Sequence, residues 1–92
     1  MTARYEPRLL PWERIWEPPR WRNLPAPPKR LRALEDQLYR GGIEPFSVRP
    51  LPQGDFELLE GRYRWRAIRA LVLSGRWWPG LKVPCWVKEG GD

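Results

Sequence analysis

Residues 59–67 read Leu-Glu-Gly-Arg-Tyr-Arg-Trp-Arg-Ala, and the rest of the chain is organised around them. A strand-like pattern ends there, Gly61 interrupts it, and an arginine-rich helical pattern begins at Arg62. The start of a helix exposes backbone N–H groups without partners and carries the positive end of the helix dipole. A glycine and several arginines at this point therefore predict an anion site, and phosphate is the expected anion.

The helix predicted for residues 62–73 has two chemically distinct sides when it is drawn at about 100° per residue. The apolar side is formed by Trp65, Ile68, Leu71 and Val72, with Ala67 at its margin. The opposite side carries Arg62, Arg66 and Arg69. We expect this basic side to be either a solvated face or a stripe that follows a nucleic acid backbone. Trp65 is expected in the core rather than as a base-stacking platform, because it lies on the apolar side.

Arg64 breaks this pattern, because it lies in the middle of the apolar arc, within the first turn of the helix. A buried guanidinium without partners is very costly. Arg64 is therefore expected to meet a carboxylate, backbone carbonyls or a bound anion, unless it is exposed at a frayed helix start. An ion pair with Glu44, Glu57 or Glu60 and a contact to a ligand phosphate are the two main interpretations.

The other elements follow from periodicity. Leucines at helical spacing after Pro28, followed by a Gly-Gly pair, predict a helix over residues 28–40. Residues 46–51 and 56–59 alternate between apolar and polar around a turn, which predicts a β-hairpin. Residues 82–87 predict a last strand.

Residues 1–28 form an arm rich in proline and tryptophan, with prolines spaced too closely for a long helix. The tryptophans make the arm too apolar for a disordered tail. We expect it to pack on a domain formed by residues 29–88, with a short strand near residues 14–16. A mobile linker is the alternative, and residues 89–92 are expected to fray.

The amino-acid composition limits the classes of partner and of catalytic site that the chain can have. The net charge is +6 with 14 arginines and 3 lysines, which favours nucleic acid or nucleotide as a partner, with an acidic protein surface as the alternative. With no histidine and only Cys85, the sequence excludes a Ser-His-Asp triad, a Cys-His dyad, an intramolecular disulfide and a thiolate zinc site. Cys85 is expected to be a small buried hydrophobe. No signal peptide or membrane span is recognisable, so a cytoplasmic location without membrane contact is expected.

Two segments carry a resemblance to a known family. Residues 42–49 read Gly-Ile-Glu-Pro-Phe-Ser-Val-Arg, and residues 56–67 read Phe-Glu-Leu-Leu-Glu-Gly-Arg-Tyr-Arg-Trp-Arg-Ala. Together they resemble the ParB-like N-terminal domain, over roughly residues 29–87. The resemblance implies the small α/β (α+β) fold that this family shares with sulfiredoxins, with a mixed sheet, a central β-hairpin and two main helices. It also implies a nucleotide-phosphate site at the helix start.

The family's site residues carry over by position. Gly61 matches the motif glycine, Arg64 the second motif arginine and Arg66 the arginine before alanine. Arg49 ends the first strand motif. By similarity to sulfiredoxins, Arg30 occupies a phosphate-contacting position on the first helix, and Gln37 stands where serine or threonine is usual.

The sequence departs from the family pattern at two positions directly after Gly61, where the related proteins carry other side chains. Arg62 replaces a glutamate and Tyr63 an arginine of the ParB motif, and the same two positions hold cysteine and histidine in sulfiredoxins. Sulfinic-acid reduction is therefore not expected. Arg62 and Tyr63 complete the predicted phosphate site, where Tyr63 could stack on a base or donate a hydrogen bond. No helix-turn-helix segment follows, so a complete partition protein is not expected either.

Three classes of function remain. The first is a binding module that holds a phosphate of a nucleotide or of DNA at residues 61–64, with a nucleoside triphosphate and Mg²⁺ as the implied ligands. The second is a phosphotransferase or nuclease, for which Glu44 and Glu60 are the acids nearest the site and no metal-ligand spacing is recognisable. The third is a protein–protein adaptor that uses exposed tryptophans of the arm and of the pair at 77–78. Binding is favoured over catalysis.

Overall fold

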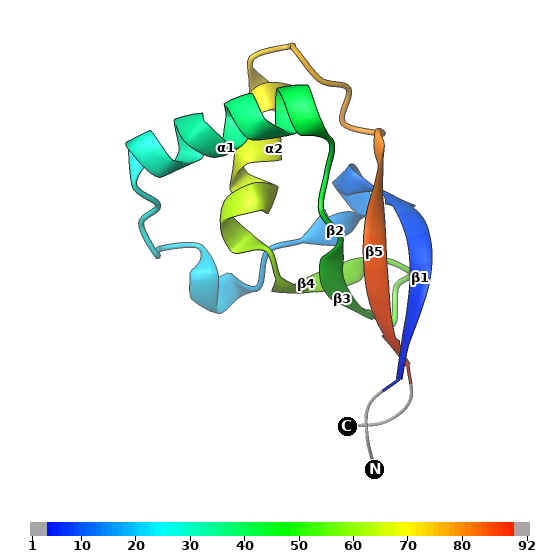
Figure 1. The fold of residues 1–92 in the computed structure, drawn as a ribbon. Helices are drawn as coiled ribbons and strands as arrows, with labels where there is room; N and C mark the ends of the chain where they lie inside the picture. Colours follow the sequence, from blue (N-terminus) through cyan, green and yellow to red (C-terminus); the bar gives the residue numbers. More distant parts are fainter. Residues whose placement is uncertain (1–3, 90–92) are drawn as a thin grey trace.

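The computed structural model describes residues 4–89 and shows one mixed sheet with two α-helices on the same side of it (Figure 1). The strand order is β1-β5-β3-β4-β2. The strands are β1 (Arg4–Pro11), β2 (Ile15–Trp16), β3 (Phe46–Pro50), β4 (Phe56–Glu60) and β5 (Lys82–Glu89). The helices are α1 (Pro28–Gly41) and α2 (Arg62–Leu73), and short 3-10 turns lie at Trp12–Arg14 and Pro19–Trp21.

The elements predicted from periodicity are confirmed. α2 has the predicted bounds, α1 and β4 are each one residue longer at the C-terminal end, and β3 ends one residue earlier. β3 and β4 form the predicted antiparallel hairpin in the interior of the sheet. A register shift between Ser47 and Val48 marks an irregularity in that pairing. β5 extends to Glu89, so Glu89 belongs to the sheet rather than to a tail, and residues 90–92 lie outside the described residues.

The arm belongs to the sheet to a greater extent than predicted. Its first part is the edge strand β1, which pairs antiparallel with β5 along its whole length and was not predicted. The prolines that argued against regular structure, Pro7 and Pro11, are compatible with an edge strand, because one side of such a strand needs no hydrogen-bond donors. The short strand expected near residues 14–16 is confirmed as β2, which pairs parallel to β4.

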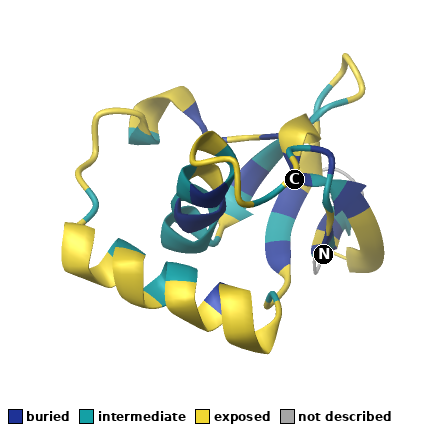
Figure 2. Ribbon diagram, turned by 90° about the horizontal axis from the view of Figure 1, so that it is seen from above, coloured by how far each residue is buried: buried dark blue, intermediate teal, exposed yellow. Residues whose placement is uncertain are grey.

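The core lies between the sheet and the helices. Strand residues alternate in burial, and the buried set on the helix side includes Phe46, Val48, Leu58, Val83 and Val87. α2 contributes the buried residues Ala67, Ile68 and Leu71, whereas α1 contributes only Leu38. Figure 2 shows this difference, with α2 dark blue on its inner side and α1 mainly yellow. α2 is therefore the central helix, and α1 packs against it.

Within residues 4–89, neither helix has the length and apolar composition that a membrane span requires.

Candidate phosphate-binding site

The turn between β4 and α2 requires a glycine for two independent reasons. Gly61 has a φ of +104° and is the N-cap of α2. A Cβ atom at this position would lie 2.5 Å from Cδ1 of the Phe46 ring. Left-handed backbone and close approach to a buried ring both favour glycine. The strand can therefore turn directly into the helix without a side-chain cap.

The start of α2 has the features of an anion site. No side chain caps the helix, and its first turn contains no acidic residue. The first intrahelical bond at this end runs from the Trp65 N–H to the Gly61 carbonyl, over 2.8 Å. The amides of residues 62–64 precede that bond, so they have no acceptor within the helix. They add to the positive end of the helix dipole.

A pocket of about 370 Å³ lies beside this turn, and we call it the Gly61 pocket. Its lining residues are Arg30, Leu34, Gly61, Arg62, Tyr63 and Arg64. Five of these six were predicted as phosphate-site residues from the sequence. Leu34 was not, because it reads as part of the apolar stripe of α1. The pocket therefore combines guanidinium groups from two helices with the start of one of them.

Tyr63 is held between charged neighbours. The guanidinium carbons of Arg30 and Arg62 each lie 4.6 Å from the centroid of the Tyr63 ring. Such cation–π contacts stabilise the orientation of exposed arginines by about 0.5–1 kcal/mol. The ring thus brings an α1 arginine and an α2 arginine to the same pocket.

Arg64 forms an ion pair, which is one of the two interpretations left open by the sequence. Its Nη1 donates to Glu44 Oε2 over 2.8 Å, and its guanidinium carbon lies 5.5 Å from the Phe46 ring centroid. The Arg64 side chain is 24% exposed, whereas that of Glu44 is 74% exposed. The partner is therefore an exposed surface carboxylate rather than a buried one, and Arg64 also lines the pocket.

Two predicted contacts are not among the residues that line the Gly61 pocket. Gln37 is exposed on α1. Arg49 is on β3, where its Nε donates to Glu57 Oε1 over 2.7 Å. The remaining candidate acid, Glu60, accepts a long hydrogen bond of 3.4 Å from the Ser47 hydroxyl. Arg49 and Glu60 therefore have partners on the sheet, whereas Gln37 lies on α1.

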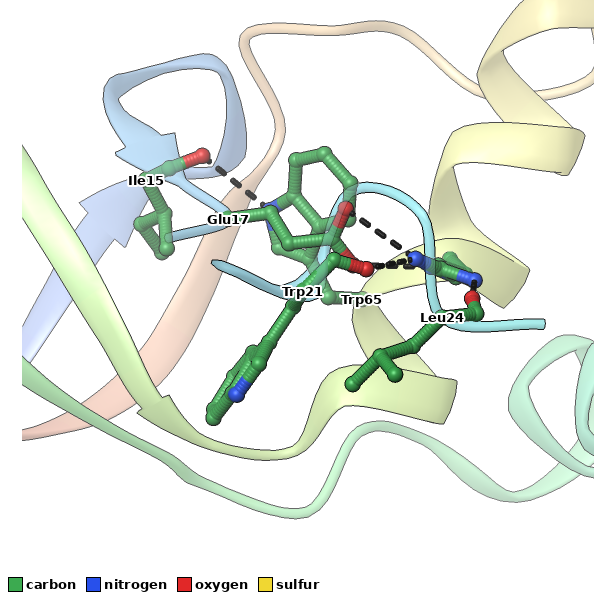
Figure 3. A network of polar contacts seen from close by, with 6 residues as sticks. Ile15, Glu17, Trp21, Leu24 and Trp65 are labelled. Atoms are coloured by element: carbon green, nitrogen blue, oxygen red, sulfur yellow. Dashed lines mark hydrogen bonds and ion pairs between the residues drawn. The ribbon is translucent and has the colours of Figure 1, made fainter. Parts of the chain in front are cut away.

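The expectation that Arg66 lies on an exposed basic face is wrong. Its side chain is only 12% exposed, and its Nε donates to Glu17 Oε2 over 2.7 Å. Further bonds reach Glu17 Oε1 and the backbone carbonyls of Trp21 and Leu24 (Figure 3). The helical wheel placed Arg66 away from the sheet correctly, but the arm crosses that side of α2. We call this network the arm clamp.

The arm clamp is built on Glu17, which the sequence showed only as one acid among several. Its side chain is 7% exposed. A buried carboxylate requires a charged or hydrogen-bonding partner, and Arg66 supplies both oxygens with donors. The one available signal was the position of Glu17 in a Trp-Glu-Pro-Pro segment between apolar residues. The clamp divides the basic side of α2, with Arg62 at the Gly61 pocket and Arg69 exposed on the other side of it along the helix.

Trp65 packs against the core, as predicted, and also joins α2 to the arm. Its ring centroid lies 5.2 Å from that of Trp12, and its Nε1 donates to the Ile15 carbonyl over 3.0 Å. Trp65 also lines a second pocket of about 350 Å³ with Trp16, Glu17, Arg22 and Arg69, which we call the arm pocket.

Cys85 is buried on β5, 2% exposed, as predicted. Burial raises the pKa of its thiol to about 11. A thiol with such a pKa is not a nucleophile at neutral pH. Among the residues from 4 to 89, no group of three or more His, Cys, Asp or Glu side chains is arranged to hold a metal ion.

The chain is similar in sequence to a known chromosome-partitioning protein. No family model matches the chain. It is 35% identical over 66 residues to the probable chromosome-partitioning protein ParB of Vibrio cholerae. That alignment covers 71% of the chain and 20% of the relative, so the chain spans about a fifth of the length of the protein it resembles.

Solved structures of ParB and sulfiredoxin have the same fold. Truncated Caulobacter crescentus ParB complexed with CTP-γ-S matches 95% of this chain and 46% of its own, with a TM-score of 0.73 and 27% identity. The same protein complexed to the centromeric parS site matches 92% of this chain and 42% of its own, with a TM-score of 0.70 and 26% identity. Arabidopsis thaliana sulfiredoxin matches 92% of this chain and 86% of its own, with a TM-score of 0.71. Its 21% identity indicates the fold alone.

The motif at residues 59–67, the strand order and these similarities agree with one another. The chain is a ParB-like domain, with the small mixed α/β fold that ParB N-terminal domains share with sulfiredoxin.

Proposed function

We propose that this ParB-like domain is a binding module that holds the phosphates of a nucleoside triphosphate in the Gly61 pocket. One observation carries the proposal: Arg30, Arg62 and Arg64 line one pocket together with the uncapped start of α2. Guanidinium groups and helix N-terminal amides are the two kinds of donor that bind phosphate best in proteins. Here they converge from two helices.

Arg64 is the residue that a phosphate would engage most directly. In the structure it contacts Glu44, whose side chain is largely exposed. An exposed ion pair of this kind contributes only about 0–1 kcal/mol, so a phosphate can replace the carboxylate at little cost. Glu44 therefore acts as a stand-in acceptor, and binding exchanges one anionic partner of Arg64 for another.

The choice of ligand is supported by similarity. Caulobacter ParB, which has this fold, was solved in complex with CTP-γ-S. CTP is therefore the first nucleotide to test. Mg²⁺ would reach the site bound to the triphosphate, since Mg²⁺ is usually held by substrate phosphates and few carboxylates.

A thermal-shift measurement with each nucleoside triphosphate, with and without Mg²⁺, tests the proposal. A ligand at about 100 times its Kd raises the melting temperature of a small domain by about 10 °C or more. Arg64→Ala should abolish the shift, whereas Arg76→Ala, which removes an exposed arginine elsewhere, should preserve it. If no nucleotide shifts the transition, or if Arg64→Ala responds like the parent, the proposal fails.

A second candidate is that the phosphate belongs to DNA, because the Caulobacter relative was also solved on parS. Arg62 and Arg69 would provide the contacts, and Arg66 is omitted because the arm clamp uses it. Affinity for duplex DNA should then fall steeply with salt and weaken in an Arg62→Ala/Arg69→Ala variant. Binding that ignores salt, or no binding, would exclude this candidate.

A further inference from the structure

The arm pocket shares no lining residue with the Gly61 pocket and has a different character. It is lined by two indole rings, Trp16 and Trp65, and by two arginines, Arg22 and Arg69, with Glu17 as the fifth residue. Its volume of about 350 Å³ is at the lower end of the range for small-ligand sites, roughly 300–1,000 Å³. It is therefore large enough for one small aromatic group.

Both indoles have fixed orientations and have already used their only donor. Trp16 Nε1 donates to Asp55 Oδ2 over 3.0 Å, and Trp65 Nε1 donates to the Ile15 carbonyl over the same distance. Trp16 is nevertheless 51% exposed. What these rings offer to a ligand is their flat apolar surface, so they favour stacking over hydrogen bonding. Because the rings are held in advance, little ordering is needed on binding.

The charged residues of the arm pocket leave a positive surplus. Glu17 is neutralised by Arg66 in the arm clamp. Arg22 and Arg69 are exposed, and within residues 4–89 neither has an ion pair or a hydrogen bond from its side chain. Two free guanidiniums beside two stacking surfaces suit a ligand that joins an aromatic ring to an anion.

We propose that the arm pocket binds one nucleotide unit of single-stranded nucleic acid, with its base stacked on the exposed Trp16 ring, the partly buried Trp65 as a wall of the pocket, and an adjacent phosphate on Arg22 and Arg69. Aromatic rings with a flanking basic track are the combination by which proteins hold single strands. A duplex does not suit the pocket, because its bases are stacked on one another and cannot reach the rings. An acidic peptide would use the arginines but not the indoles.

This proposal goes beyond the nucleotide site, because it assigns to the arm a surface that binds single-stranded nucleic acid. It does not depend on nucleotide binding in the Gly61 pocket, so either of these two sites can fail alone. It shares Arg69 with the duplex-DNA candidate, and the comparison of single strand with duplex distinguishes the two. The arm clamp acts here as a positioning element, because Arg66 holds the arm segment that carries Trp16 and Arg22 against α2.

Fluorescence anisotropy with a labelled oligothymidylate of about eight nucleotides tests the proposal at low salt. Arg22→Ala/Arg69→Ala should weaken binding at least tenfold. Arg32→Ala/Arg76→Ala removes the same charge from exposed positions outside the pocket and should weaken it less than threefold. Trp16→Ala should lower affinity about 5- to 150-fold, and Trp16→Phe should restore most of it, because base stacking accounts for about 1–3 kcal/mol.

Four outcomes would overturn the proposal. The first is that the parent chain does not bind the oligonucleotide, and the second is that the two double variants lose affinity equally, which indicates an effect of net charge alone. The third is that a duplex of the same length binds as tightly as the single strand. The fourth is that poly-glutamate competes as well as unlabelled oligonucleotide. An Arg30→Ala/Arg64→Ala variant separates the two sites, since it should keep single-strand binding while losing any nucleotide-induced thermal shift.

Discussion

Arg64 and Arg66 are two residues apart on α2, yet the regions around them differ in almost every respect. Arg64 opens onto the Gly61 pocket and pairs with an exposed carboxylate. Arg66 lies under the arm, where a buried carboxylate and two backbone carbonyls use its donors. One region is a surface pocket whose arginine has an exposed partner, and the other is a buried network that holds the arm on α2.

The difference shows that an arginine's role depends on its acceptors more than on its place in a motif. Exposed acceptors such as Glu44 can be replaced by a ligand at low cost. Buried acceptors such as Glu17 cannot, because separation leaves an uncompensated charge inside the protein. Binding is therefore expected at the first region, and stability is expected to depend on the second.

The largest effect is expected when the arm clamp is broken. Arg66→Ala leaves Glu17 buried without its charged partner, which destabilises a protein by about 3–5 kcal/mol. Urea unfolding should show this loss, while Arg69→Ala on the same helix should change stability by no more than about 0.5 kcal/mol. Equal and small effects of the two substitutions would show that Arg66 does not hold the arm on α2.

Gly61→Ala is expected to have the next largest effect. A side chain there is strained by its positive φ and collides with Phe46, so we expect a loss of about 2–4 kcal/mol. Gly54→Ala is a matched control, because Gly54 also has a positive φ of +96° but nothing lies within 4 Å of an added Cβ. The two unfolding free energies should differ by the collision alone. If both variants lose the same amount, the contact with Phe46 does not restrict the turn.

The sequence predicts those elements and site residues whose pattern lies within one short segment, and it misses those that depend on contacts between distant segments. The hairpin and α2 follow from periodicity and glycine placement. Four of the six residues that line the Gly61 pocket belong to the motif at residues 59–67, and a fifth, Arg30, was predicted from the family resemblance. β1 was missed because its pairing with β5 joins the two ends of the chain and its prolines read as irregular structure. The clamp was missed because a helical wheel does not show what the arm covers.

A smaller effect, on affinity, is expected at Glu44. Glu44→Gln keeps the shape of the side chain and removes the charge that competes for Arg64, so triphosphate should bind up to about tenfold more tightly. Calorimetric titration of the variant and the parent measures the difference. A Glu44→Gln protein that binds more weakly would mean that this carboxylate supports the ligand instead of standing in for it.

The smallest effect at neutral pH concerns Cys85. Its pKa is raised from 9.0 to about 11 in the folded chain, so the protonated thiol is the form that folding favours. This contribution is complete below pH 9 and is lost as the pH rises from 9 to 11. The difference in unfolding free energy between the parent and Cys85→Ala should therefore be constant up to pH 9 and shrink above it. Lysines and tyrosines that titrate in this range are present in both proteins, so their effect cancels in the difference. A constant difference across this range would contradict the burial of the thiol.

The comparison between the two regions is tested most directly by an NMR titration of ¹⁵N-labelled protein with CTP and Mg²⁺, following the backbone amides of α2. We predict saturable shifts of the amides at 62–64, which lie at the Gly61 pocket, and unchanged Arg66 side-chain signals, because the arm clamp stays closed. Tripolyphosphate should move the same three amides. Shifts confined to other parts of the chain, or no saturable shift at residues 62–64, would contradict the assignment of the helix start as the phosphate site.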